Sequence, residues 1–167
     1  IYSLLVLTFV TLTANAQFGP GDIAFTTYNS DGAGPSLGVD TFAFVALTDI
    51  SADDSITFTD NGWFAAGGFR SGESHLKVIF LSDFPCGTEF IIIGTAVYDA
   101  GFSDAAITDG SELNLSTSGD QIFAYDSANE PTAGDESGFI AGIQMNSASG
   151  WDADATSSNT TALPSAL

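Results

Sequence analysis

Short apolar runs that alternate with turn-forming clusters are the feature of this chain that most restricts its fold. The clusters, rich in Gly, Asp, Asn and Ser, recur about every ten residues, a spacing typical of sandwiches of short strands. Of the 21 acidic residues, 16 are Asp and five are Glu, and Asp favours turns where Glu favours helices. We therefore expect an all-β sandwich with no amphipathic helix after residue 17.

The apolar pattern predicts eight strands. Residues 41–47 are apolar on both faces, which is typical of a central strand buried on both sides. Residues 56–59 alternate, so we expect a half-buried strand that turns Thr57 and Thr59 outward. The expected strands cover residues 21–28, 41–47, 56–59, 76–81, 90–93, 112–115, 121–125 and 139–145.

Residues 1–16 are expected to be a cleavable signal peptide whose first residues are missing. The uncharged apolar run at 4–12 is shorter than the roughly 20 residues that span a bilayer. It is followed by Ala14-Asn15-Ala16, a small-residue cleavage pattern. A buried N-terminal strand or helix is the alternative. We expect the sandwich domain at 17–146, a polar linker or truncated continuation at 147–167, and secretion to the outside or the outer cell surface.

The charge balance excludes several partners. The formal net charge is −19, and the only basic residues are Arg70 and Lys77. Binding to nucleic acid or to an anionic membrane requires many cations, so neither is expected, and no membrane insertion is expected after signal cleavage. Cys86 is the single cysteine and His75 the single histidine, which leaves no internal disulfide and no zinc site.

The sequence predicts no catalytic site in this chain. Ser74 and His75 are neighbours, but neighbouring residues on a strand point to opposite faces. No G-x-S-x-G pattern occurs, and a nucleophilic role for Cys86 would need an activating base. An enzyme module that follows residue 167 stays open.

Calcium is the one metal that the residues suggest. Asn29, Asp31 and Asp40 match the pattern of a calcium-binding loop only in part. Asp152 with Asp154 is a weaker candidate. The alternative is turn chemistry, in which these side chains bond their own backbone. No other cofactor is expected.

An aromatic loop is the candidate ligand-binding site. Trp63, Phe64 and Phe69 surround a Gly67-Gly68 pair, and Arg70 follows. If exposed, these rings would stack on a sugar or contact a protein partner. The alternative, which we favour, is that the aromatics fold back and cover one end of the sandwich.

Four stretches carry a resemblance to a known group of proteins. They are residues 21–25, 40–50, 58–63 and 119–125. Together they resemble the N-terminal domain of secreted Bacteroidota-type surface proteins, and in layout they are similar to the lamin-tail-like domain. The resemblance implies an immunoglobulin-like β-sandwich without established catalytic residues. Where the lamin-tail pattern has a Glu-rich strand, this chain has an apolar one at 42–45.

The expected function is that of a non-catalytic extracellular or cell-surface module, structural or adhesive, within a longer exported bacterial protein. Its partner would be an extracellular glycan or protein. One alternative is a carbohydrate-binding module that uses the Trp63 and Phe64 loop. Another is an accessory domain of a secreted hydrolase.

Overall fold

The computed structural model describes residues 18–30, 38–146 and 150–167. These residues form two antiparallel sheets and contain no helix. The all-β sandwich expected from the sequence is therefore confirmed. The nine strands are β1 (Ile23–Asn29), β2 (Thr41–Ala46), β3 (Ser55–Thr59), β4 (His75–Phe80), β5 (Glu89–Ile93), β6 (Ala96–Asp99), β7 (Ala106–Gly110), β8 (Gln121–Asp126) and β9 (Phe139–Gln144).

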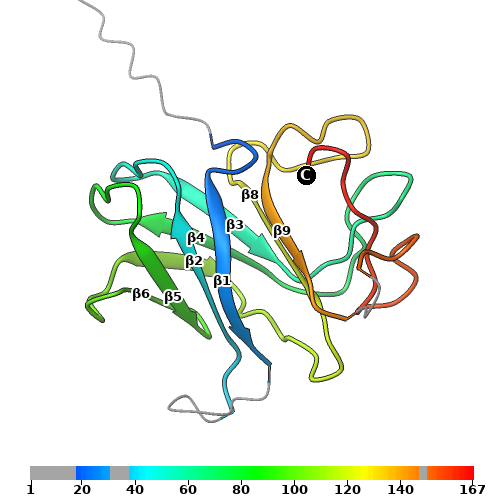
Figure 1. Ribbon diagram of the computed structural model, residues 1–167, viewed down its shortest axis with the longest axis horizontal. Coiled ribbons are helices and arrows are strands. Elements are labelled where there is room, and N and C mark those ends of the chain that lie inside the picture. Colours follow the sequence, from blue (N-terminus) through cyan, green and yellow to red (C-terminus); the bar gives the residue numbers. More distant parts are fainter. Residues whose placement is uncertain (1–17, 31–37, 147–149) are drawn as a thin grey trace, which may run out of the picture.

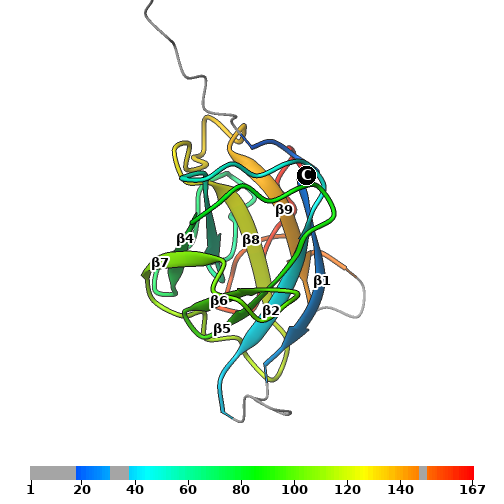
Figure 2. The same cartoon turned by 90° about the vertical axis from the view of Figure 1, so that its left-hand side faces the viewer.

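The two sheets contain four and five strands (Figures 1 and 2). The first has the order β1-β2-β5-β6, and the second has the order β7-β4-β3-β8-β9. Backbone hydrogen bonds join the sheets at both sides. Gly21 N–H donates to the Ile140 carbonyl at 2.9 Å beside β1 and β9, and Ala105 N–H donates to the Val97 carbonyl at 3.0 Å beside β6 and β7.

Phenylalanine rings fill the space between the sheets. The rings of Phe42 and Phe44 on β2 each lie 5.1 Å from the ring of Phe58 on β3. Phe90 lies 5.1 Å from both Phe44 and Phe80. All five are buried, and each such pair adds about 0.5–1.5 kcal/mol beyond the area it buries. β2 is a central strand between β1 and β5, as its two apolar faces predict.

The prediction that β3 is half-buried is wrong. Thr59 is 0% exposed and Thr57 6%, because a second aromatic layer covers the outer face of the five-stranded sheet. In Figure 1 the loop after β3 and the red C-terminal segment lie together beyond β9. We call this the outer layer, and its rings and apolar side chains are Trp63, Phe69, Phe123, Phe139, Trp151 and Ala166.

Part of the stretch at 147–167, for which a polar linker or truncated continuation is expected, packs against the sandwich. Within the described part of that stretch, Ala155, Thr161 and Ala162 are buried. Residues 150–167 therefore pack on the sandwich as part of the folded domain. Their polarity is explained by hydrogen bonds to the chain, because Asp152 accepts from Gln144 Nε2 at 3.0 Å and from Thr161 N–H at 3.2 Å.

Residues 112–115 do not form the expected strand. Leu113 and Leu115 are buried, but no neighbouring strand pairs with this stretch. The N–H of Asn114 donates to Asp60 Oδ2 at 2.9 Å, and that of Leu115 donates to Asp40 Oδ2 at 2.6 Å. Two aspartates thus replace a partner strand. Strands β6 and β7 were not predicted, because each is short and only weakly apolar.

Candidate functional site

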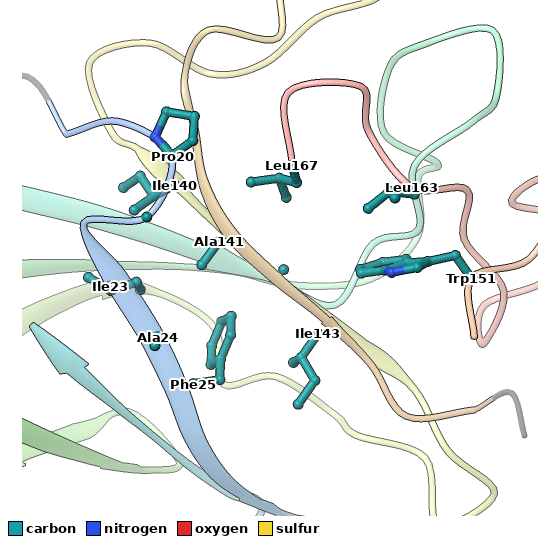
Figure 3. A pocket seen from close by; sticks show the side chains of 12 residues that line it. Pro20, Ile23, Ala24, Phe25, Ile140, Ala141, Ile143, Trp151, Leu163 and Leu167 are labelled. Carbon is teal, nitrogen blue, oxygen red and sulfur yellow. The ribbon is translucent and has the colours of Figure 1, made fainter. Parts of the chain in front are cut away.

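An apolar groove of about 640 Å³ runs along the open edge of β9 (Figure 3). One wall consists of β1, with Ile23 and Phe25, and the opposite wall is formed by residues of the C-terminal segment. The backbone of β9 lies between them. We call this the β9 groove; its lining residues are Pro20, Gly21, Ile23, Ala24, Phe25, Ile140, Ala141, Gly142, Ile143, Trp151, Leu163 and Leu167.

Aromatic contacts with the core and with the outer layer support both walls of the β9 groove. The ring of Phe25 lies 6.2 Å from the rings of Phe42 and Phe58 in the core. On the other side, Trp151 stacks on Phe123 of the outer layer at 5.7 Å with an interplanar angle of 23°. The groove is therefore a preformed feature of the sandwich, as ligand sites usually are.

The lining of the β9 groove has almost no polar side chains. None of its described lining residues carries an ionisable group, a hydroxyl or a thiol, and the Trp151 indole is the only side chain with a polar atom. Acid–base and nucleophilic catalysis both require such groups. The groove therefore combines apolar side chains with exposed backbone polar groups, and it suits a ligand that matches both.

The aromatic loop does not present Trp63 to solvent. The indole is 1% exposed and packs edge-on against Phe69 at 5.0 Å and Phe139 at 4.9 Å. Phe69 itself lies 5.7 Å from the ring of Tyr125. Trp63 and Phe69 thus cover the outer face of the sheet, which matches the alternative that we favoured for this loop.

The other two residues of that loop are half-buried. Phe64 N–H donates to the Gly68 carbonyl at 3.0 Å, and Arg70 N–H donates to the Gly62 carbonyl at 2.7 Å. These bonds fold the loop back on itself. The structure brings Phe64 and Arg70 next to the outer layer, and it leaves no exposed indole face beside them for a sugar.

The calcium candidates do not form one cluster in the described structure. Asp31 lies outside the described residues, and Asn29 ends β1, where it pairs with Thr41. Asp40 accepts the N–H of Leu115, as described above. Asp154 Oδ1 accepts the N–H groups of Ala65 and Ala155 at 2.8 and 2.9 Å.

These carboxylates therefore act as acceptors for backbone amides. Across residues 18–30, 38–146 and 150–167, no three His, Cys, Asp or Glu side chains group closely enough to hold a metal ion.

A group of buried acids lies at one end of the five-stranded sheet, and the sequence analysis did not identify it. Asp60 accepts from Ser74 N–H at 2.7 Å as well as from Asn114. Asp120 accepts from Ser116 N–H at 2.8 Å and from Gln121 N–H at 2.9 Å. The consecutive amides 114, 115 and 116 are thus each held by a different aspartate: Asp60, Asp40 and Asp120.

Burial raises the pKa of three acids at this end of the sheet, which are Asp60, Asp120 and the nearby Glu73. It raises the pKa of Asp60 and raises that of Asp120 to about 6. The pKa of Glu73 is raised to about 7, first by burial and then by the charges of Asp60 and Asp120. Glu73 Oε2 is buried and accepts no hydrogen bond from the described residues. We interpret the group as structural, because its aspartates hold a loop.

His75 and Cys86 occupy positions without catalytic geometry. His75 Nδ1 lies 2.9 Å from the Tyr125 hydroxyl, and Nε2 lies 3.1 Å from Asn61 Nδ2. Both ring nitrogens therefore have polar partners, and the ring lies 5.9 Å from the ring of Phe69 in the outer layer. Cys86 is exposed and free, and its N–H donates to Asp49 Oδ1 at 2.8 Å in a turn.

The described part of the chain has no helix long and apolar enough to cross a membrane. Searches of protein-family models, curated proteins and solved structures gave no match to this chain.

Proposed function

We propose that this chain is a non-catalytic binding and structural module that acts outside the cell or on its outer surface. In this proposal residues 1–16 direct export, and the sandwich contributes to a longer adhesive or structural protein. The single observation that carries the binding role is the β9 groove, a preformed apolar site whose described lining has no ionisable side chain.

The charge of the chain supports an extracellular role. A net charge of −19 with two cations keeps a protein soluble and repels other anions. A single free cysteine means that the domain does not depend on a disulfide, so its stability comes from its aromatic core and outer layer. A rigid sandwich of this kind can present a binding site without moving.

Within the proposal, the sandwich is immunoglobulin-like and close to the lamin-tail layout. The two antiparallel sheets of four and five strands support this assignment. The proposed contact with the ligand moves from the loop of Trp63 and Phe64 to the β9 groove, because the indole is buried.

Export can be tested directly by expressing the chain, with an initiator methionine added, in a bacterium that has a general secretion pathway. Fractionation and N-terminal mass spectrometry are expected to find a product that begins at Gln17 outside the cytoplasm. A cytoplasmic product that keeps residues 1–16 would contradict the proposal. The same sample should bind to arrays of extracellular proteins and show no hydrolysis of fluorogenic esters and glycosides.

A further inference from the structure

We propose that the β9 groove binds an extended apolar peptide segment of a partner protein, which adds to the sheet as a strand along the edge of β9. The inference deepens the proposed function, since it rests on the premise that the chain acts by binding. It names where the partner binds and what kind of segment it offers.

The hydrogen bonds of β9 show which of its peptide groups point away from β8. Met145 N–H donates to the Asp120 carbonyl at 2.6 Å. In this register the backbone N–H and C=O groups of Ile143 and Ala141 point toward β8. The alternate residues Gly142 and Gln144 direct their N–H and C=O groups away from β8. No hydrogen bond within the described structure occupies these outward groups.

A free strand edge of this kind is a template for another strand. In β-augmentation, main-chain hydrogen bonds supply affinity, and pockets for alternate side chains supply specificity. At one end the edge is already used, because Gly21 N–H donates to the Ile140 carbonyl. Beyond that bond, the outward backbone groups of Gly142 and Gln144 have no hydrogen-bond partner among the described residues.

The walls of the groove define the chemistry of the occupant. Side chains of a strand alternate between two faces, so alternate residues of an added strand would meet opposite walls. One set would contact Phe25, and the other would contact Trp151 and Leu163 (Figure 3). Both walls are apolar, and the fitting segment is therefore apolar on both faces, a continuous run of β-branched or aromatic residues.

Gly142 fits the packing of the outer layer on β9. A Cβ atom at this position would lie 2.9 Å from Phe123 Cδ1, closer than real Cβ atoms come, and 3.1 Å from Leu167 Cδ1, tighter than most Cβ contacts. The glycine therefore lets these two side chains lie close to the β9 backbone. Gly142 also lines the groove, and no hydrogen bond within the described structure occupies its outward N–H and C=O groups.

Charge favours a basic partner over a second copy of this chain. Neither of the two cations, Arg70 and Lys77, lines the groove, and Asp22 and Asp152 are next to lining residues at its two walls. A second copy would bring another net charge of −19 to the same surface. A partner whose apolar run is flanked by Lys or Arg would instead be attracted.

The test uses the full chain and a synthetic peptide, a run of alternating valine and isoleucine flanked by lysine pairs. We expect saturable binding by calorimetry, weakened by salt, and slowed amide hydrogen exchange at Gly142 and Gln144 by NMR. The same peptide N-methylated at alternate residues keeps its side chains but loses edge hydrogen bonds. Its affinity should be at least about tenfold lower.

A pair of protein variants supplies the matched control. Ile143→Lys places a charge in the groove on β9, whereas Ile107→Lys changes an exposed isoleucine on β7, the opposite edge of the same sheet. We expect the first to abolish binding and the second to leave it unchanged. If Ile143→Lys fails to fold, the N-methylated peptide still decides the question on the unmodified chain.

Several results would overturn the inference. These are no binding, equal binding of the N-methylated peptide, or equal loss in both variants. Concentration-dependent dimers that protect Gly142 without peptide would assign the groove to a second copy. Protection in the full chain that disappears in a chain starting at Gln17 would assign it to residues 1–16. Retention in the cytoplasm with groove binding intact would overturn the proposed function alone.

Discussion

The backbone N–H of Trp63 donates to Oγ1 of Thr161 at 2.7 Å, a contact between residues 98 positions apart. The Trp63 carbonyl in turn accepts the N–H of Ala162 at 2.9 Å. These two bonds tie the loop after β3 to the C-terminal segment, and together they hold the outer layer on the five-stranded sheet.

Loss of the Thr161 hydroxyl should destabilise the fold. Thr161→Val leaves the buried N–H of Trp63 without an acceptor, which costs about 1–3 kcal/mol. Urea denaturation should show a lower midpoint, and near-ultraviolet circular dichroism should show a weaker tryptophan signal. The control is Thr95→Val at an exposed threonine. Equal effects of the two substitutions would contradict the role of the Trp63–Thr161 bond.

Trp63 should act as a core residue. Because the indole packs between Phe69 and Phe139, Trp63→Ala is expected to cost about 3–5 kcal/mol of unfolding free energy. Phe102→Ala, at a ring that is 70% exposed, should change stability by about 0.5 kcal/mol or less. A Trp63→Ala protein with unchanged stability would show that the outer layer is not packed as described.

Glu73 should make the protein less stable as pH rises. Its pKa is raised from 4.5 to about 7 in the folded chain by burial and by Asp60 and Asp120, with Arg70 opposing them. The folded state therefore holds the proton more tightly than the unfolded state. This contribution is fully present below about pH 4.5 and is lost as pH rises through about 7.

Glu73→Gln should remove this dependence. The amide stays neutral at all pH values and adds a donor where Oε2 accepts no bond, so at pH 8 we expect about 1 kcal/mol of added stability. Thermal melts of both proteins from pH 4 to 8 measure the difference. Parallel curves across that range would contradict the prediction, and Glu130→Gln on the surface serves as control.

Gly119 should tolerate a side chain less well than Gly68. Both have positive φ, +101° and +90°, so alanine is strained at each by about 1–3 kcal/mol. At Gly119 an added Cβ would also lie 2.4 Å from Asn146 Cα, whereas at Gly68 nothing lies within 4 Å. Chemical denaturation should therefore show the larger loss for Gly119→Ala. Equal losses of stability in the two variants would mean that backbone strain alone causes the loss, without a contribution from the contact with Asn146.

Local patterns were sufficient for most of the strands because alternation and turn residues are local properties. At 112–115 the sequence predicts a strand, and its apolar residues Leu113 and Leu115 are buried, but the local pattern could not show what pairs with their backbone. The acceptors are Asp60 and Asp40, which lie 54 and 75 positions away from Asn114 and Leu115. Only the fold brings them to this loop.

The β9 groove could not be predicted for a similar reason. Its walls come from residues 20–25, 140–143 and 151–167. These three stretches lie in separate parts of the sequence, and none contains a motif associated with catalysis or ligand binding. Gly142 within an apolar run was one local signal, because glycine in a strand often marks a bulge, a bend or the close approach of a ligand or another backbone. The bond between Trp63 and Thr161 likewise joins residues 98 positions apart.

The way in which the C-terminal segment is fastened has a mechanical consequence. A tensile load applied at Leu167 would first detach Ser165 and Ala166 from Glu136, to which each donates a hydrogen bond. It would then meet the two bonds between Trp63 and the 161–162 pair. Force is thus passed to the loop after β3 and shared with the centre of the five-stranded sheet, while the edge strand β9 is spared from peeling.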